Sequence, residues 1–149
     1  MTTVRYRLLT EGARAPRRMT DGAAGYDLFA SAPPETVFFP GQAVRMRPLR
    51  YHTGVAFEIP AGHVGLVFPR SSVSRTGVRL SNCVGVIDSD YRGEVTFVFD
   101  RLAHGEAYKE GDRIGQIVFV RLPETEIVEA SGPLSATARG EGGYGSTGR

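Results

Sequence analysis

The sequence predicts an all-β sandwich or barrel in a single domain, and three observations support this class. Short alternating or β-branched runs recur along the chain, and turn residues separate them at intervals of about eight to twelve residues. No long stretch carries apolar residues at helical spacing. The length of 149 residues suits one domain, and 41% hydrophobic with 23% charged residues is typical of a water-soluble globule.

Most of the predicted strands in the first half of the chain are short. Residues 4–9 alternate between polar and apolar side chains, and a loop carrying Pro16 follows. The next strand-like stretch, 23–30, is unusual because Asp27 lies between apolar neighbours. Further strands are expected at 36–39, 43–46, 54–59 and 64–68, each bounded by proline or glycine turns.

One short helix is expected at 71–76, where Ser71 or Ser72 would cap the start and Gly77 would mark the end. A helix N-terminus offers free N–H groups and a positive dipole end, so the serines, with Arg70 before them, would also suit an anion. Helix capping alone explains the same residues.

The stretch 82–95 carries the most informative pattern. An apolar run at 84–87 leads into Asp88-Ser89-Asp90, and a second apolar run begins at Val95, which together predict a β-hairpin. Asp and Ser favour turns because their side chains bond nearby backbone N–H groups, so a simple turn explains the loop taken alone. The alternative is that Asp88 is a catalytic carboxylate held rigidly near an aromatic residue, Tyr91.

A long apolar strand is expected at 114–122 and a last short one at 126–128. Gln116 interrupts the apolar run and needs a hydrogen-bond partner, which a ligand phosphate could supply. The preceding Gly111-Asp112-Arg113 also fits a turn with a structural Asp–Arg pair.

The C-terminal stretch becomes rich in glycine from Ser131. Such a tail should be mobile when no ligand is bound, because glycine loses the most entropy on ordering. The expected division is therefore a β domain at 1–130 and a flexible C-terminal arm at 131–149.

Composition excludes several classes of protein. The net charge is +2 and the charges are interspersed, which argues against a nucleic-acid-binding patch. Of the 18 basic residues only Lys109 is lysine, and although arginine suits phosphate, genome base composition produces the same skew. No stretch resembles a membrane span or a signal peptide.

Cysteine and histidine usage limits the redox and metal chemistry. The single cysteine, Cys83, rules out an internal disulfide, favours a reducing cytoplasmic location and is expected to be packed. The three histidines, His52, His63 and His104, lack metal-ligand spacing and are expected at the surface. Any metal would then be bound by oxygen, and Mg²⁺ held partly by substrate phosphates is the natural case.

Five stretches of the chain, taken in order, resemble the motifs of the trimeric dUTP diphosphatase (dUTPase) family. They are Ala24-Gly25-Tyr26-Asp27-Leu28-Phe29-Ala30, then Pro69-Arg70-Ser71-Ser72-Val73 through Gly77, then Gly85-Val86-Ile87-Asp88-Ser89-Asp90-Tyr91-Arg92-Gly93-Glu94, then Gly111-Asp112-Arg113-Ile114-Gly115-Gln116, and finally Arg139-Gly140-Glu141-Gly142-Gly143-Tyr144-Gly145-Ser146-Thr147-Gly148. One such motif is a weak signal, whereas five in the family's order and spacing are specific and favour function over simple turns.

The resemblance implies a jelly-roll-like β-barrel or sandwich that forms a homotrimer, with each active site shared between subunits. It also implies hydrolysis of dUTP to dUMP and pyrophosphate with Mg²⁺. That reaction limits uracil in DNA and supplies dUMP for thymidylate synthesis. No nucleic-acid or membrane partner is implied.

Roles for individual residues follow from the same resemblance. Asp88 resembles the base that activates the water attacking the α-phosphorus. The third motif would bind uracil through its backbone at Val86 and Ile87, with a side-chain contact from Asn82. Tyr91 would lie under the deoxyribose and exclude a 2′-hydroxyl.

The resemblance also assigns residues to the phosphates and the metal. Arg70, Ser71, Ser72 and Gln116 would hold the phosphates, and Asp27 resembles the acid that supports the hydrated metal through water. In the arm, Tyr144 would stack on the base and Gly145 belongs to the same substrate-binding set, while Arg139, Ser146 and Thr147 would close on the γ-phosphate.

Three positions depart from the family pattern without removing a functional group. Tyr144 stands where phenylalanine is usual, Gly115 replaces alanine and Arg75 replaces the frequent lysine.

Two alternatives compete with this interpretation. The dCTP deaminase branch is similar in fold, but its deaminating glutamate falls where this sequence has Val98, which disfavours deamination. The other alternative is a non-catalytic nucleotide sensor or interaction module. The joint presence of Asp88, Tyr91, Gln116 and Arg139 argues against it.

Overall fold

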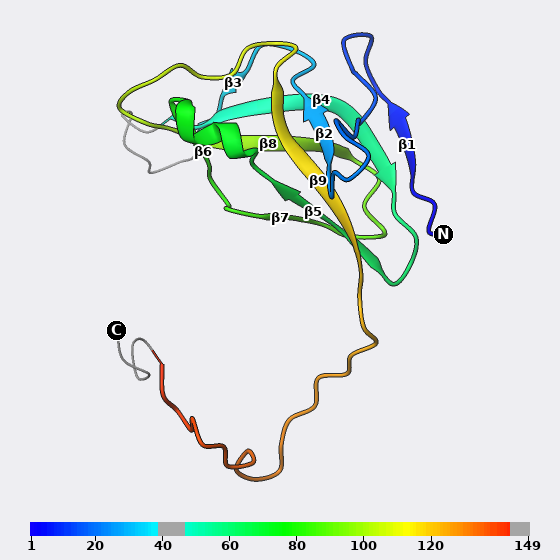
Figure 1. The fold of residues 1–149 in the computed structure, drawn as a ribbon, viewed down its shortest axis with the longest axis vertical. Coiled ribbons are helices and arrows are strands. Elements are labelled where there is room, and N and C mark those ends of the chain that lie inside the picture. Colours follow the sequence, from blue (N-terminus) through cyan, green and yellow to red (C-terminus); the bar gives the residue numbers. More distant parts are fainter. Residues whose placement is uncertain (39–46, 144–149) are drawn as a thin grey trace.

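A computed structural model describes residues 1–38 and 47–143. This part of the chain forms two antiparallel sheets, which confirms the predicted all-β class (Figure 1). The first sheet has the order β1 (Arg5–Leu8), β4 (Leu49–Glu58), β8 (Glu94–Arg101) and β6 (Val78–Leu80), and β3 (Glu35–Thr36) also pairs with β4. The second sheet has the order β2 (Tyr26–Phe29), β9 (Arg113–Arg121), β5 (His63–Phe68) and β7 (Gly85–Ile87).

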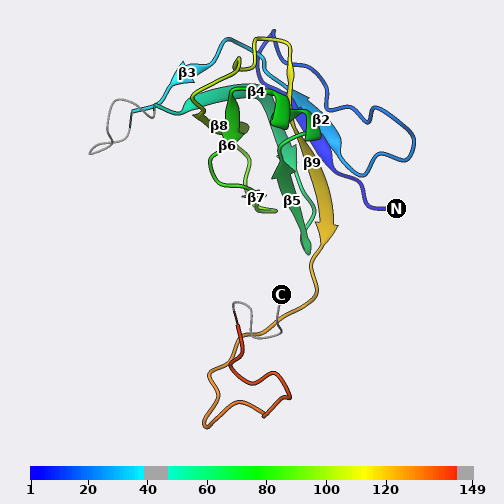
Figure 2. The same ribbon diagram turned by 60° about the vertical axis from the view of Figure 1, so that its left-hand side comes forward.

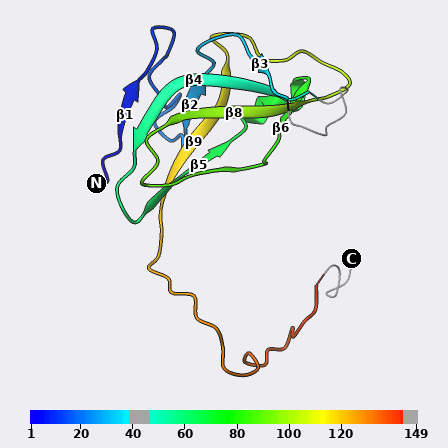
Figure 3. The same ribbon diagram turned by 180° about the vertical axis from the view of Figure 1, so that it is seen from behind.

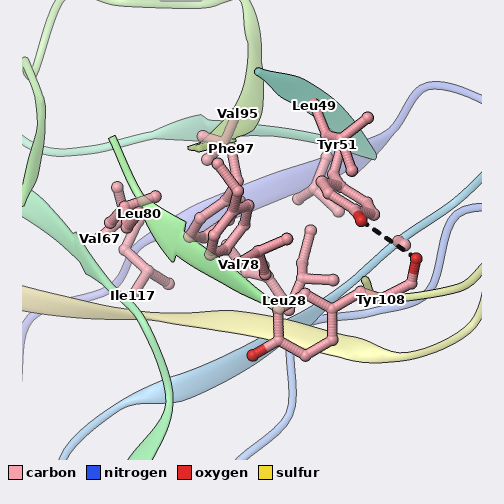
Figure 4. Packing of buried hydrophobic residues seen from close by; sticks show 14 of the residues in the cluster. Leu28, Leu49, Tyr51, Val67, Val78, Leu80, Val95, Phe97, Tyr108 and Ile117 are labelled. Atoms are coloured by element: carbon pink, nitrogen blue, oxygen red, sulfur yellow. Dashed lines mark hydrogen bonds between the residues drawn. The ribbon is translucent and has the colours of Figure 1, made fainter. Parts of the chain in front are cut away.

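The core lies between the two sheets and follows from the alternation of each strand. In β8 the buried residues Val95, Phe97 and Phe99 alternate with partly exposed ones, as expected for a strand with one covered face. Ile114 and Ile117 of β9 are fully buried in the same cluster. Figure 4 shows side chains of both sheets meeting in this layer.

Strand β4 contains a bulge, and it pairs with β8 on both sides of it. The register with β8 shifts between His52 and Ala56. Gly54, inside the shift, has a φ of 66°, which favours glycine. The buried Thr53 hydroxyl donates to the Val95 carbonyl at 2.6 Å, so the bulge leaves this buried polar group paired.

The predicted hairpin at 82–95 is wrong. Strand β7 pairs with β5 in the second sheet, whereas β8 pairs with β4 and β6 in the first (Figure 2). The loop from Asp88 to Gly93 therefore crosses between sheets. Two apolar runs around an Asp-Ser turn are compatible with a hairpin and with a loop between two sheets. The pattern indicates where the chain turns but not which neighbour each strand pairs with.

Several other expectations differ from the structure. Strand β6 was not expected, because its three residues give too short a pattern. The strand expected at 126–128 does not form, since no strand among residues 1–38 and 47–143 lies beside this segment. The strand expected at 43–46, like the end of the one at 36–39, lies outside the described residues.

The predicted helix is a 3-10 turn, Ser71–Arg75, and its capping was predicted wrongly. Arg70 occupies the N-cap position, and no side chain caps the start. Ser72 Oγ instead accepts from Arg70, and within the turn Ser74 Oγ donates to the Ser71 carbonyl. Gly77 follows the turn because a side chain there would overlap the Gly105 carbonyl.

The segment after β9 leaves the two sheets (Figures 1 and 3). Residues 120–141 are all exposed, including Ile127 at 95% and Leu134 at 84%. In the part of the chain that the structure describes, no helix has the length and apolar character needed to cross a bilayer. Cys83, expected to be packed, is exposed.

His52, expected at the surface, is partly buried between two carboxylates. Its Nδ1 lies 2.8 Å from Glu94 Oε2, and its Nε2 lies 2.6 Å from Glu35 Oε1. A carboxylate only accepts, so satisfying both contacts requires the doubly protonated ring. The Glu94 hydrogen bond raises the pKa of His52, and Glu35 raises it further, against the lowering effect of burial.

We expect this ion triad to make the stability of the protein depend on pH. Because folding raises the pKa of His52, its stabilisation is fully present below about pH 6.5, the unfolded value. It is lost as the pH rises through the raised folded value. His52→Gln should flatten the change in melting temperature between pH 6 and 8.5, while the exposed control His104→Gln should not. A wild-type slope retained in His52→Gln would contradict this assignment.

Gly115 is required by the packing of this particular core. A side chain at Gly115 would overlap the ring of Phe97 and approach the Phe68 carbonyl to 2.9 Å. We expect Gly115→Ala, which introduces the residue usual in the family that the sequence resembles, to lower the free energy of unfolding by about 1–3 kcal/mol. The double variant Gly115→Ala with Phe97→Leu should recover part of the loss in urea titrations. Equal stability of Gly115→Ala and the wild type would refute the clash.

Candidate functional site

A buried carboxylate with two guanidiniums connects three of the sequence motifs. Asp27 is only 7% exposed, and its Oδ2 lies 3.2 Å from Arg70 Nε and 3.3 Å from Arg113 Nη1. Strands β2 and β9 place Asp27 directly opposite Gln116. Two guanidiniums against one carboxylate leave a net positive charge, which suits an anionic ligand.

The side chain of Gln116 is hydrogen-bonded within the chain. Its Nε2 donates to the Pro69 carbonyl at 3.2 Å, so the amide joins β9 to the residue just before Arg70. Gly25 allows this approach, since a side chain there would lie 2.7 Å from Gln116 Oε1. The Gln116 amide thereby places the second motif beside the fourth.

Arg113 is a site residue that the sequence analysis missed. The Asp–Arg pair of the alternative simple-turn explanation for 111–113 does not form, because Asp112 Oδ2 accepts from the Lys109 backbone N–H at 2.7 Å. Arg113 reaches Asp27 instead. From the sequence, a charged residue in a turn is only a weak indication of a site residue. The sequence does not show that β2 lies next to β9, which is what brings Arg113 to Asp27.

The 3-10 turn presents polar groups beside this cluster. Arg70 Nη1 donates to Ser72 Oγ at 3.2 Å, and Ser71 is exposed. A single 3-10 turn offers little dipole, so the positive character here comes chiefly from Arg70 and Arg113. The structure thus groups Asp27, Arg70, Ser71, Ser72 and Gln116, all predicted from sequence, at one end of β5 and β9.

The residues predicted to bind uracil meet at a separate cavity. Asn82, Val86 and Ile87 line an open cavity of about 600 Å³ between the edges of the two sheets. Val98 lines it too, so the position of the deaminating glutamate is apolar here. The carboxylate present, Asp100, is engaged by Ser81 Oγ at 2.8 Å.

Asp88 and Tyr91 belong to the loop that joins the sheets. Asp88 is exposed just after β7, and its carbonyl accepts from the Tyr91 backbone N–H at 3.2 Å. The Tyr91 hydroxyl donates to the Glu94 carbonyl at 3.0 Å, and its ring lies where a side chain on Gly93 would be. The loop therefore fixes the aromatic ring close to the carboxylate-bearing turn.

Within one chain, Asp88 is far from the Asp27 cluster. Ile87 pairs with Gly65, so Asp88 follows at the level of Val64, whereas Gln116 pairs with Phe68. This offset along β5 corresponds to about 13 Å at the rise of a β-strand. Asp88 lines a cavity of about 390 Å³ whose described lining includes neither arginine nor lysine.

Of the predicted arm residues the structure describes Arg139, which is not brought to either place. Arg139 is exposed, and its Nε donates to the Gly142 carbonyl at 2.8 Å. Tyr144, Gly145, Ser146 and Thr147 lie outside the described residues.

Comparison with known proteins identifies the family. The dUTPase family matches residues 11–148. The chain belongs to the dUTPase family. Deoxyuridine 5'-triphosphate nucleotidohydrolase from Anaeromyxobacter sp. (strain Fw109-5) is 46% identical over 138 residues, covering 90% of this chain and 87% of that protein. The enzyme of the same name from Mycobacterium marinum is 42% identical over 147 residues, covering 94% and 91%.

Solved dUTPase structures share the fold. A mutant dUTPase of Staphylococcus bacteriophage 80alpha with dUpNHpp has a TM-score of 0.75 and 26% identity, covering 100% of both chains. A mutant dUTPase from phage phi11 of S. aureus, described with a structural Mg(II) ion, has a TM-score of 0.69 and 26% identity over 87% of this chain and 97% of that one. This dUTPase is accordingly a hydrolase of dUTP.

Proposed function

We propose that the protein hydrolyses dUTP to dUMP and pyrophosphate by attack of an Asp88-activated water on the α-phosphorus. It acts as a cytoplasmic homotrimer of jelly-roll-like domains, residues 1–130, with arms at 131–149. The reaction limits uracil in DNA and supplies dUMP for thymidylate synthesis. The observation that carries the proposal is the cluster of Asp27, Arg70 and Gln116, which joins three motifs at an anion-binding surface.

The phosphates bind at this cluster. Asp27 holds the Arg70 and Arg113 guanidiniums in place before substrate arrives, so little reorganisation is needed on binding. Ser71, Ser72 and Gln116 supply further donors. Arg139, Ser146 and Thr147 of the arm close on the γ-phosphate, while Tyr144 and Gly145 cover the base.

Uracil binds beside β7, and Asp88 carries out the proton transfer. Backbone groups of Val86 and Ile87, with the Asn82 side chain, match the edge of uracil, and Tyr91 lies under the deoxyribose. Asp88 takes a proton from the attacking water while the water oxygen forms a bond to the α-phosphorus. The bond between that phosphorus and the pyrophosphate leaving group breaks. A positioned general base contributes roughly 10² to 10⁴ in rate.

Because the cluster is net positive, a magnesium ion there would be held mainly by the substrate phosphates, with Asp27 contributing through water. Within residues 1–38 and 47–143, no group of three or more His, Cys, Asp or Glu could hold a metal by itself. Asp27 contributes one carboxylate at the cluster, which suits a contact through water. When bound, Mg²⁺ neutralises phosphate charge and helps orient the triphosphate.

The distance of about 13 Å between the level of Asp88 and that of Gln116 along β5 supports an active site shared between subunits. Asp88 of one chain would then act on phosphates held by Arg70 of a neighbouring chain. We expect Asp88→Asn and Arg70→Ala each to have strongly reduced activity alone, by about 10²-fold or more for Asp88→Asn. When the two variants are refolded together in equal amounts, roughly a quarter of the sites in random trimers should combine both wild-type residues.

The regained rate of pyrophosphate release measures this complementation. Mixing Asp88→Asn with wild type, and each variant with itself, provides the controls. Absence of any regained activity in verified mixed trimers would place Asp88 and Arg70 of the same chain in one site.

The experiment that tests the function is pyrophosphate release from dUTP, dCTP, dTTP and UTP in parallel, with Mg²⁺ and with EDTA. Release from dUTP alone, weakened by EDTA, is the expected result. Cytosine is rejected because its hydrogen-bonding groups do not match the buried polar groups of the pocket. Thymine is rejected because the narrow pocket has no room for its 5-methyl group. A folded protein that binds dUpNHpp but releases no pyrophosphate would instead be a nucleotide-binding module.

A further inference from the structure

The carboxylate of Glu94, which ends the third motif, is held at two points on β4. Its Oε1 accepts from the Gly54 backbone N–H at 2.6 Å, and its Oε2 lies 2.8 Å from His52 Nδ1. The backbone of Glu94 pairs with Ala56, so the side chain reaches back along β4 into the bulge. Hydrogen bonds to an ionised carboxylate are stronger than neutral ones. These contacts therefore fix the first residue of β8 against β4.

The backbone of the same residue holds the phenol of Tyr91. The Tyr91 hydroxyl donates to the Glu94 carbonyl at 3.0 Å. The ring lies where a side chain on Gly93 would be, so it folds back over the loop toward the start of β8. Tyr91 is 44% exposed, so burial in the core does not hold its ring. The direction of the ring therefore depends on how firmly Glu94 is held.

We propose that Glu94 is a positioning residue that selects the sugar of the substrate through Tyr91. The inference rests on the proposed function, in which Tyr91 lies under the deoxyribose. The anchored carboxylate keeps the Glu94 backbone in place, and the carbonyl of that backbone holds the phenol. The ring then occupies the space that a 2′-hydroxyl would need. A ring free to tilt would admit ribose, because such exclusion requires a contact residue held by supporting hydrogen bonds.

The alternative is a purely structural role, because the Glu94 carboxylate also completes the β4 bulge. Thr53 lies in the same bulge and is fully buried. Its hydroxyl donates to the Val95 carbonyl at 2.6 Å, so Thr53→Val weakens the bulge without removing a contact of Glu94 or Tyr91. This variant is the matched control for a loss of stability alone.

The test uses UTP as a competitive inhibitor of dUTP hydrolysis and measures the ratio of its inhibition constant to the KM for dUTP. We expect Glu94→Ala to lower this ratio by about 5- to 10-fold, the scale of one lost hydrogen bond to a charged group. Glu94→Gln should retain most of the wild-type ratio. Its amide oxygen accepts from the Gly54 N–H, and its amide N–H donates to the neutral ring of His52. Thr53→Val should lower the melting temperature and leave the ratio unchanged.

A double-variant cycle tests whether Glu94 acts through Tyr91. Tyr91→Phe changes an exposed side chain and should lower the ratio about as much as Glu94→Ala does, with the fold intact. In the Tyr91→Phe background, Glu94→Ala should not lower the ratio further, because the phenol that Glu94 holds is gone.

Four outcomes would each overturn the inference. They are an additive loss in the double variant, a wild-type ratio in Glu94→Ala or Tyr91→Phe, an equal loss in Thr53→Val, and a loss in Glu94→Gln as large as in Glu94→Ala. Failure of the proposed function is distinguishable, since the wild type would then release no pyrophosphate from dUTP.

Discussion

Asp88→Asn is expected to lower kcat for dUTP by about 10²-fold or more while leaving fold and nucleotide binding intact. The amide has nearly the same shape as the carboxylate but cannot accept the proton of the attacking water. Asp88 is exposed in its loop, so no buried partner loses a contact. Single-turnover pyrophosphate release measures the chemical step, and titration with dUpNHpp measures binding.

Asp90→Asn is the matched control for this variant. Asp90 is exposed in the same turn, two residues further on, and the same change in charge there should leave kcat near the wild-type value. An Asp88→Asn enzyme with undiminished kcat would make Asp88 a turn residue only. Equal losses in both variants would point to the charge of the loop rather than to a base.

Deletion of residues 139–149 is expected to reduce kcat/KM for dUTP by about 10²-fold, because in the proposed mechanism the arm completes the phosphate clamp and excludes water from the site. The described residues of the arm lie away from both sheets, and all except Gly142 are exposed. Removing them should therefore leave the melting temperature and the oligomeric state unchanged. Turnover, thermal melting and sedimentation of the truncated protein check the three expectations.

Two further variants locate the effect within the arm. Deletion of Arg149 alone, which follows the last motif, should have little effect. Arg139→Ala should weaken dUpNHpp more than dUMP, since only the former carries a γ-phosphate. Full activity after deletion of 139–149 would exclude the arm from catalysis.

The all-β class could be predicted because it depends on local pattern. Alternation in a strand such as β8 records which side chains face the core, and the Asp-Ser-Asp turn records where the chain changes direction. The same signals could not predict that β7 pairs with β5 and β8 with β4. Pairing is decided by the packing of the two sheets, to which residues distant in sequence contribute.

For the candidate site too, some features could be predicted from the sequence and others depend on the tertiary structure. By itself the sequence determined the chemical groups, since Asp27, Arg70, Asp88 and Gln116 were predicted from the first four of five ordered motifs. Only the tertiary structure decided that Arg113 joins Arg70 on Asp27, and that Asp88 lies at the other end of β5. A side chain's chemistry is fixed by its covalent structure, whereas its partners depend on strand register, which sets distances between segments far apart in the chain.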